Sequence, residues 1–179
     1  MKKTAVLLYP QFSEYELSIA LSVLMQGNKP IVTVGFTNQL IKGESGLSCV
    51  ADSYVDEINP DEIDSILLPG CMDIMSLTDE VRLFDFIKKV TTKETVIASI
   101  SSSPFLLAKA GVLTGKKYTV GMTEENRDMV GVFEKENYSN EMVVQDGNII
   151  TARGRGFIRF GIYLGKALNL EFDERWYQE

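Results

Sequence analysis

Short runs of apolar and β-branched residues alternate with segments of helical character, and this alternation restricts the fold more than any other feature of the chain. Four such runs, each typical of a strand buried on both faces, occupy residues 5–9, 31–36, 65–68 and 95–98. Segments that predict helices occupy residues 13–27, 78–90, 104–110 and 157–168. Strands that alternate with helices form right-handed βαβ units. The pattern therefore predicts an α/β fold with a doubly wound, mostly parallel sheet between two layers of helices.

Two further segments are typical of hairpins. Residues 39–42 and 47–50 flank the sequence GESG, and residues 142–145 and 148–151 flank Asp146-Gly147. The first predicts a small β-hairpin in addition to the core strands. The length of 179 residues, without a linker or an internal repeat, predicts a single domain over residues 1–179.

Charge and hydropathy argue against several classes of partner. The net charge is −7 and basic residues occur at most in pairs, so we expect no binding to nucleic acid or to anionic membranes. No apolar stretch approaches the ~20 residues of a membrane span, and the run at 5–9 is too short for a signal peptide. Two cysteines are too few for a disulfide scaffold, so a reducing, cytoplasmic location is expected.

The chain contains no histidine. The commonest general base at neutral pH is therefore missing, and neither a Ser-His-Asp triad nor a Cys-His dyad can form, even between identical subunits. The usual zinc and non-haem iron sites lose their main ligand as well. We expect no metal site and no cofactor.

Ligands of open α/β sheets bind outside the carboxyl ends of the strands, which directs attention to Ser101. Ser101 follows a predicted strand and precedes a predicted helix, with small residues two positions before and after it. This is the steric requirement of a nucleophile elbow, and the helix that follows offers N–H groups to an anion. Ser103 can also be the N-cap of a helix beginning at Pro104, and the two interpretations are compatible.

Two acidic residues lie in the first turn after the first strand. Glu16 can face the strand ends, or it can form a capping box with Ser13 at the start of its own helix. Glu14 is an equally placed acidic competitor.

Cys71 follows Pro69-Gly70 at the end of the third core strand. A thiol in such a loop can have a lowered pKa and be reactive, or it can be a small buried apolar residue. Cys49, in the predicted hairpin, is interpreted as packing.

Arg153 and Arg155 join the last strand to the last helix. Their guanidinium groups can bind a carboxylate or phosphate, or form ordinary surface ion pairs.

Taken together, these segments resemble the ThiJ/PfpI (DJ-one) family of the class I glutamine amidotransferase-like fold. Four segments carry the resemblance: FSEYEL (12–17), ILLPG (66–70), ASISSSPFLLAKAGVL (98–113) and TARG (151–154). They look like the family's acidic helix start, its strand ending in Pro-Gly-Gly, its Ala-Ile-Cys-x-Gly-Pro elbow with helix, and its closing Thr-Ser-Arg-Gly. The resemblance implies a flavodoxin-like three-layer sandwich, a homodimer, and Glu16 as the family's site glutamate.

The departures from the family pattern fall in the site. Ser101 occupies the position of the nucleophilic cysteine, Cys71 that of the second Gly, Ser103 that of the Gly before the elbow proline, and Arg155 that of a Pro. Family members are described as peptidases, glyoxalase- or deglycase-like enzymes, isocyanide hydratases, chaperones and oxidation sensors. Nearly all of these activities are tied to the cysteine.

Two hypotheses for function follow. We favour a small-molecule-binding or stress-responsive dimer that has lost cysteine-hydrolase activity, with Cys71 as a sensor thiol. The alternative is a hydrolase, lyase or glutamine-amidotransferase-like enzyme on a small carbonyl or amide substrate. It would use Glu16 as acid and base with Ser101 or Cys71, and the backbone N–H groups of Gly70 and Ser102 as an oxyanion hole.

Overall fold

The computed structural model of the protein describes residues 1–178 and shows a seven-stranded sheet in the order β5-β2-β1-β6-β7-β9-β8. Six strands are parallel and β8 pairs antiparallel with β9, while β3 and β4 form a separate small hairpin. The main-sheet strands are β1 (Lys3–Leu7), β2 (Ile31–Gly35), β5 (Ser53–Tyr54), β6 (Ile63–Leu68), β7 (Val96–Ile100), β8 (Val143–Asp146) and β9 (Ile149–Ala152). The hairpin consists of β3 (Ile41–Lys42) and β4 (Ser48–Cys49). The α/β fold and its mostly parallel sheet are confirmed.

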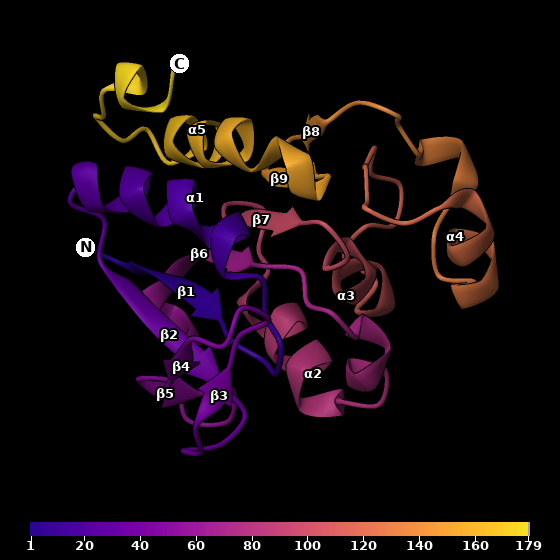
Figure 1. The fold of residues 1–179 in the computed structure, drawn as a ribbon, viewed down its shortest axis with the longest axis horizontal. Coiled ribbons are helices and arrows are strands. Elements are labelled where there is room, and N and C mark those ends of the chain that lie inside the picture. The colour runs from indigo at the N-terminus through magenta and orange to yellow at the C-terminus, as the bar shows by residue number, and fades with distance from the viewer. Residues whose placement is uncertain (179) are drawn as a thin grey trace.

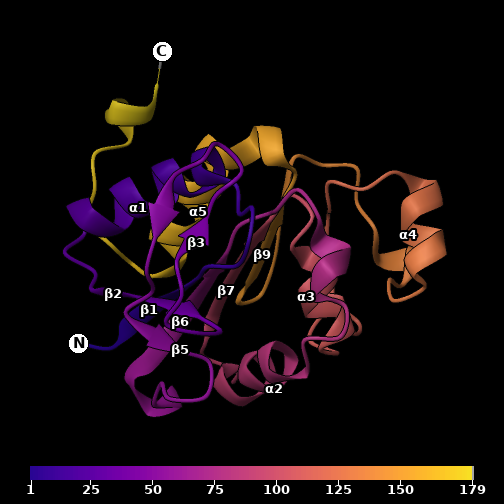
Figure 2. The same ribbon diagram turned by 60° about the horizontal axis from the view of Figure 1, so that its bottom comes forward.

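Helices cover both faces of the sheet (Figures 1 and 2). The α-helices are α1 (Glu14–Gln26), α2 (Val81–Val90), α3 (Pro104–Lys109), α4 (Glu124–Val130) and α5 (Phe157–Ala167). Helices α1 and α5 pack together on one face, and α2 and α3 lie on the other. The close approach of α1 and α5 depends on Gly161, because a Cβ there would lie 2.7 Å from the backbone nitrogen of Ala20.

The core strands are continuous runs of residues buried on both faces of the sheet. Every residue of β7 is buried, and so are four of the five residues of β1. Burial on both faces is what a parallel sheet between helix layers requires, and it explains why continuous apolar runs predicted these strands. Parallel strands place all their carboxyl ends at one edge, so the loops after β1, β6 and β7 meet there.

Some details differ from the sequence-based expectation. Helix α2 begins at Val81 with Glu80 as its N-cap, so Thr78 does not cap it, and the Thr78 hydroxyl is buried without a partner among residues 1–178. Strand β5 and helix α4 were not predicted. Helix α4 has no buried residue and so shows no apolar face in its sequence. Figures 1 and 2 show it projecting beyond α3 at the side of the sheet.

Candidate functional site

Ser101 occupies a strained turn between β7 and α3. Its φ of +64° lies in the left-handed region, which is uncommon for a residue with a side chain. Two backbone hydrogen bonds hold it there: its N–H donates to the carbonyl of Ala152 at 2.8 Å, and its carbonyl accepts from Gly121 at 2.7 Å. The backbone thus has the form of an elbow that presents one side chain at the edge of the sheet.

The predicted helix start is also found. Ser103 occupies the N-cap position of helix α3, which begins at Pro104, but its side chain makes no capping hydrogen bond. Its buried hydroxyl lies 2.8 Å from the carbonyl oxygens of Leu68 and Ile100, and 2.7 Å from the hydroxyl of Ser99. The side chain that replaces the family's glycine therefore ties the elbow to the end of β6.

Glu16 lies at the strand ends and not in a capping box. Ser13 makes no cap hydrogen bond, and its hydroxyl donates to Glu44 at 2.7 Å. The Glu16 side chain is buried, with the residue 2% exposed, and its carboxylate accepts a hydrogen bond from the Gly70 N–H at 2.7 Å. The Tyr15 hydroxyl lies 3.4 Å from Glu16 Oε1. Glu16 and Ser101 adjoin one another, since a Cβ on Gly70 or on Gly154 would lie within 3.4 Å of both side chains.

Burial raises the pKa of Glu16 above the ordinary glutamate value. Hydrogen bonds from Gly70 and Ser101 favour the charged form and oppose the shift, while the negative charge of Glu44 adds to it. Glu16 thus holds a proton more readily than an exposed glutamate, as a group that donates or accepts a proton near neutral pH requires.

The competing acid, Glu14, has a different role. Its carboxylate accepts from the N–H groups of Ser45 and Leu47 at 3.0 to 3.2 Å and so holds the β3–β4 hairpin against the start of α1. Although burial raises its pKa, these backbone hydrogen bonds lower it more, and the net shift is downward.

Two glycines allow Glu16 and Ser101 to meet. A Cβ on Gly70 would lie 2.7 Å from Ser101 Cβ and 2.8 Å from Glu16 Oε2. A Cβ on Gly154 would lie 2.8 Å from Glu16 Oε1 and 3.4 Å from Ser101 Oγ. The pair is therefore enclosed by backbone, and no larger residue fits at Gly70 without displacing it.

The predicted oxyanion donors differ in availability. The Gly70 N–H already donates to Glu16, so the prediction that it is a free oxyanion donor is wrong. The Ser102 N–H has no hydrogen-bond partner among residues 1–178 and is free to meet a ligand. The Cys71 N–H donates only a long bond, 3.3 Å, to the Ser102 hydroxyl. The Ser102 N–H is therefore available as a donor, and the Cys71 N–H is only weakly engaged.

Cys71 is not an activated thiol. Burial, together with the negative charges of Asp73, Glu16 and Glu44, raises its pKa to about 12, against a weaker lowering by the backbone of Asp73. Of the two alternatives for Cys71, the reactive thiol with a lowered pKa is not supported, because burial first, and then nearby negative charge, disfavours a thiolate. Cys71 packs against the core beside Phe12, with which it forms an isolated bridge. Cys49 also packs against the core and is not disulfide-bonded.

A cavity of about 320 Å³ opens at Ser101. It is lined by Tyr15, Ser101, Gly121, Met122, Thr123, Arg153, Gly154 and Arg155. Both predicted arginines therefore meet Ser101 at one cavity, whereas Cys71 is not among the lining residues. The sequence did not indicate Tyr15 or the loop 121–123, because that loop has no motif and reaches the elbow only through the Gly121 hydrogen bond.

The arginines make few contacts of their own. The Arg153 guanidinium donates to Asn140 at 3.3 Å. Among residues 1–178, no carboxylate oxygen lies within 4.0 Å of Arg153 or Arg155, so the ion pairs offered as an alternative role are not formed.

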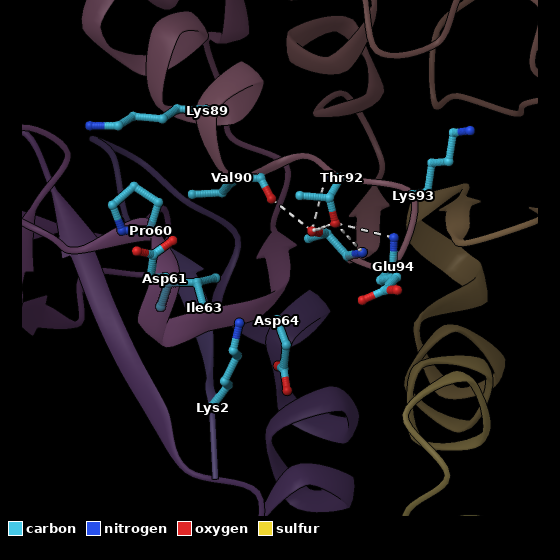
Figure 3. Close-up of a pocket in the computed structure, with 11 residues that line it drawn as sticks. Lys2, Pro60, Asp61, Ile63, Asp64, Lys89, Val90, Thr92, Lys93 and Glu94 are labelled. Atoms are coloured by element: carbon cyan, nitrogen blue, oxygen red, sulfur yellow. Dashed lines mark hydrogen bonds between the residues drawn. The ribbon is translucent and has the colours of Figure 1, made fainter.

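A larger cavity, of about 550 Å³, lies at the opposite edge of the sheet (Figure 3). Its walls come from residue 2, from the segments that lead into β6 and β7 and from the end of α2, and they combine lysines with carboxylates, such as Lys2, Lys89 and Asp61. It contains neither Glu16 nor Ser101. Over residues 1–178 no group of three His, Cys, Asp or Glu side chains is placed to hold a metal, and no helix is both long and apolar enough to cross a bilayer.

Comparison with known proteins agrees with this geometry. The model of the DJ-1/PfpI family matches residues 2–164. A deglycase of Thermococcus kodakarensis is 31% identical over 156 residues, which cover 86% of this chain and 91% of the relative. Deglycase PfpI of Pyrococcus furiosus is 29% identical over 148 residues, covering 82% and 86% of the two chains. The crystal structure of a DJ-1 superfamily protein of Agrobacterium tumefaciens has the same fold, with a TM-score of 0.87 at 21% identity over 98% of this chain and 94% of that one.

Proposed function

Because this chain belongs to the DJ-1/PfpI family, we propose that it keeps the family's pocket as a binding site for a small carbonyl compound and lacks cysteine-based turnover. The observation that carries the proposal is that the Ser101 hydroxyl, at the strained turn, adjoins the buried Glu16 carboxyl. Serine stands where the family's nucleophilic thiol would be, and its neighbours orient the hydroxyl as a hydrogen-bonding group.

Serine is a poor replacement for the thiol in covalent chemistry. A thiol with a pKa near 8.5 is a few per cent thiolate at neutral pH, whereas a serine hydroxyl needs a base to remove its proton. The chain has no histidine, and the base that adjoins Ser101 is the Glu16 carboxylate. The nearby thiol of Cys71 does not compensate, because its pKa is raised to about 12. A role for Cys71 as a sensor thiol is therefore not part of the proposal.

The retained strain supports a binding role. A non-glycine residue in the left-handed region costs about 1–2 kcal/mol, and such residues persist where the surrounding structure and the function require them. Around Ser101 the turn places a hydroxyl and two arginines at one cavity, and the N–H of the next residue, Ser102, has no partner among residues 1–178. A carbonyl oxygen is the group that a hydroxyl and an N–H can bind together.

The same observations define a second candidate, in which the protein is an enzyme. The raised pKa of Glu16 suits a general acid and base, and relatives of this chain are named deglycases. In that case Glu16 would move the proton while the amides of Ser102 and Cys71 stabilise an oxyanion.

We also propose a homodimer, as the family resemblance implies. Support from the chain itself is limited to exposed apolar side chains, among them Tyr15 at the cavity.

One experiment separates the two candidates. Purified protein is screened against small aldehydes, amides and nitriles, with binding followed by calorimetry and turnover by product formation, beside Ser101→Cys, Ser101→Ala and Glu16→Gln. We expect the wild type to bind without turnover above background, and Ser101→Cys to gain thiol reactivity. Turnover by the wild type that Ser101→Ala and Glu16→Gln abolish would establish the enzyme instead. Absence of any binding would contradict the proposal.

A further inference from the structure

The cavity at Ser101 carries positive charge in a protein that is acidic overall. The net charge is −7, yet Arg153 and Arg155 line this cavity and no Asp or Glu is among its lining residues. Of the four other arginines, Arg82 pairs with Asp56 and Glu80, both at 3.1 Å, and Arg175 pairs with Asp173 at 2.8 Å, whereas Arg127 and Arg159 have no carboxylate within 4.0 Å among residues 1–178. Within residues 1–178 neither cavity arginine has a carboxylate within 4.0 Å. Their positive charges are therefore available to an anion that enters the cavity.

The segment that carries these arginines is held in place. The Arg153 N–H donates to the carbonyl of Met142 at 2.9 Å, and the Gly156 N–H donates back to the carbonyl of Arg153 at 2.8 Å. Residues 154–156 form one 3-10 turn that leads directly into α5. Gly154, between the two arginines, is in contact distance of Glu16 and Ser101. The guanidinium groups therefore extend from a fixed backbone beside the elbow hydroxyl.

The nature of these groups indicates the ligand. Guanidinium groups bind planar carboxylates through paired hydrogen bonds. A volume of about 320 Å³ is at the small end of ligand cavities, so the ligand is small. Glu16 adjoins Ser101, and the negative charge of Glu44 acts on Glu16. These acidic groups would repel a dianion such as phosphate more strongly than a monoanion.

We propose that the ligand is a small 2-oxo or 2-hydroxy monocarboxylic acid, with its carboxylate bound by Arg155 and Arg153 and its other oxygen at the Ser101 hydroxyl. This inference rests on the proposed binding function and adds the class of compound. It makes Arg155 the residue that determines specificity, at a position where the family pattern has a proline.

The test uses calorimetry on the full chain with pyruvate as probe and methyl pyruvate as its neutral match. We expect pyruvate to bind at least tenfold more tightly than the ester, because the ester cannot form charge-assisted hydrogen bonds. Arg155→Gln should weaken the binding of pyruvate about tenfold and leave the affinity for the ester unchanged. Arg155→Lys should lose less affinity for pyruvate. Arg159→Gln is the matched control, since Arg159 is exposed on α5 and does not line the cavity.

The outcomes separate this inference from the proposed function. Equal affinity for pyruvate and its ester, or no effect of Arg155→Gln, would overturn the carboxylic-acid assignment while the binding function stands. Tighter binding of inorganic phosphate than of pyruvate would overturn it too. Binding of neither organic probe, nor of the aldehydes, amides and nitriles, would remove the proposed function itself.

Discussion

Gly70→Ala should destabilise the protein strongly, because the space for a methyl group at the end of β6 is already filled. The new Cβ would lie 2.7 Å from Ser101 Cβ, 2.8 Å from Glu16 Oε2 and 3.0 Å from Ser101 Oγ, whereas ordinary contacts begin near 3.4 Å. Neither neighbour moves easily, since Ser101 is held by two backbone hydrogen bonds and Glu16 is buried. Overpacking of this kind costs about 3 kcal/mol, or roughly 6–12 °C in Tm for a domain of this size.

Urea and thermal unfolding followed by circular dichroism measure the loss, with Gly46→Ala as control. Gly46 has a φ of +96° and nothing within 4 Å of its Cβ position, so only the backbone cost of about 1 kcal/mol applies. Ser101→Gly should recover about 1.5 kcal/mol or more of the Gly70→Ala loss, because it removes two of the three close contacts. Alone, Ser101→Gly should change stability by less than about 1 kcal/mol, since relief of strain opposes the lost hydrogen bond. A Gly70→Ala loss no larger than that of Gly46→Ala, or no coupling to Ser101, would refute this description of the site.

Three further predictions concern charge, reactivity and assembly. Because burial raises the pKa of Glu16, the folded protein holds that proton more tightly than the unfolded chain, so stability should fall as pH rises from the ordinary glutamate pKa to the raised one. Glu16→Gln should remove this part of the pH dependence of stability, as measured by urea titrations from pH 4 to 7.5. Each tenfold difference in proton affinity between the folded and unfolded states contributes about 1.4 kcal/mol to the free energy of unfolding. An unchanged profile would contradict the prediction. Since burial raises the Cys71 pKa from 9.0 to about 12, its thiolate fraction at neutral pH should be about a thousandfold lower than that of an exposed cysteine. Mass spectrometry should therefore find that iodoacetamide labels Cys71 slowly in the folded state and fast in urea. Rapid labelling of folded Cys71 would show that the acidic surroundings do not control the thiol. Light scattering at micromolar concentration should give the mass of two chains, and the mass of one chain would rule out the proposed dimer.

The order of strands and helices was predictable because burial on both faces leaves a direct mark on composition. Runs such as residues 65–68 and 95–98 are apolar without alternation, and they became the centre of the sheet as β6 and β7. Helix α4 left no such mark, since no face of it is buried. Strand β5 has two residues, which is too short for any periodicity.

The site was predictable only where a motif fixes the backbone. The small residues around Ser101 indicated the turn, and the structure places that residue at φ +64°. The contact of Glu16 with Gly70 could not be derived from local spacing, because a capping box requires the same two residues, Ser13 and Glu16, at the same spacing. What decides between them is the hydrogen bond of Ser13 to Glu44, 31 residues along the chain. The shift of the Cys71 pKa likewise depends first on burial by the folded chain, and then on negative charges that include Glu16 and Glu44, which are distant in sequence.

The hydrogen bond from Ser101 to Ala152 has a consequence for synthesis of the chain. Strand β9 lies beside β7 and supplies that carbonyl. Gly154, two residues after β9, lies against the Glu16 side chain. Because a chain leaves the ribosome from its N-terminus, β1, β2, β6 and β7 emerge well before β9. The elbow therefore lacks its anchor until residues 149–154 arrive. An unfinished nascent chain therefore lacks Arg153 and Arg155 of the proposed binding site, and a ligand of that site would stabilise only the nearly completed polypeptide.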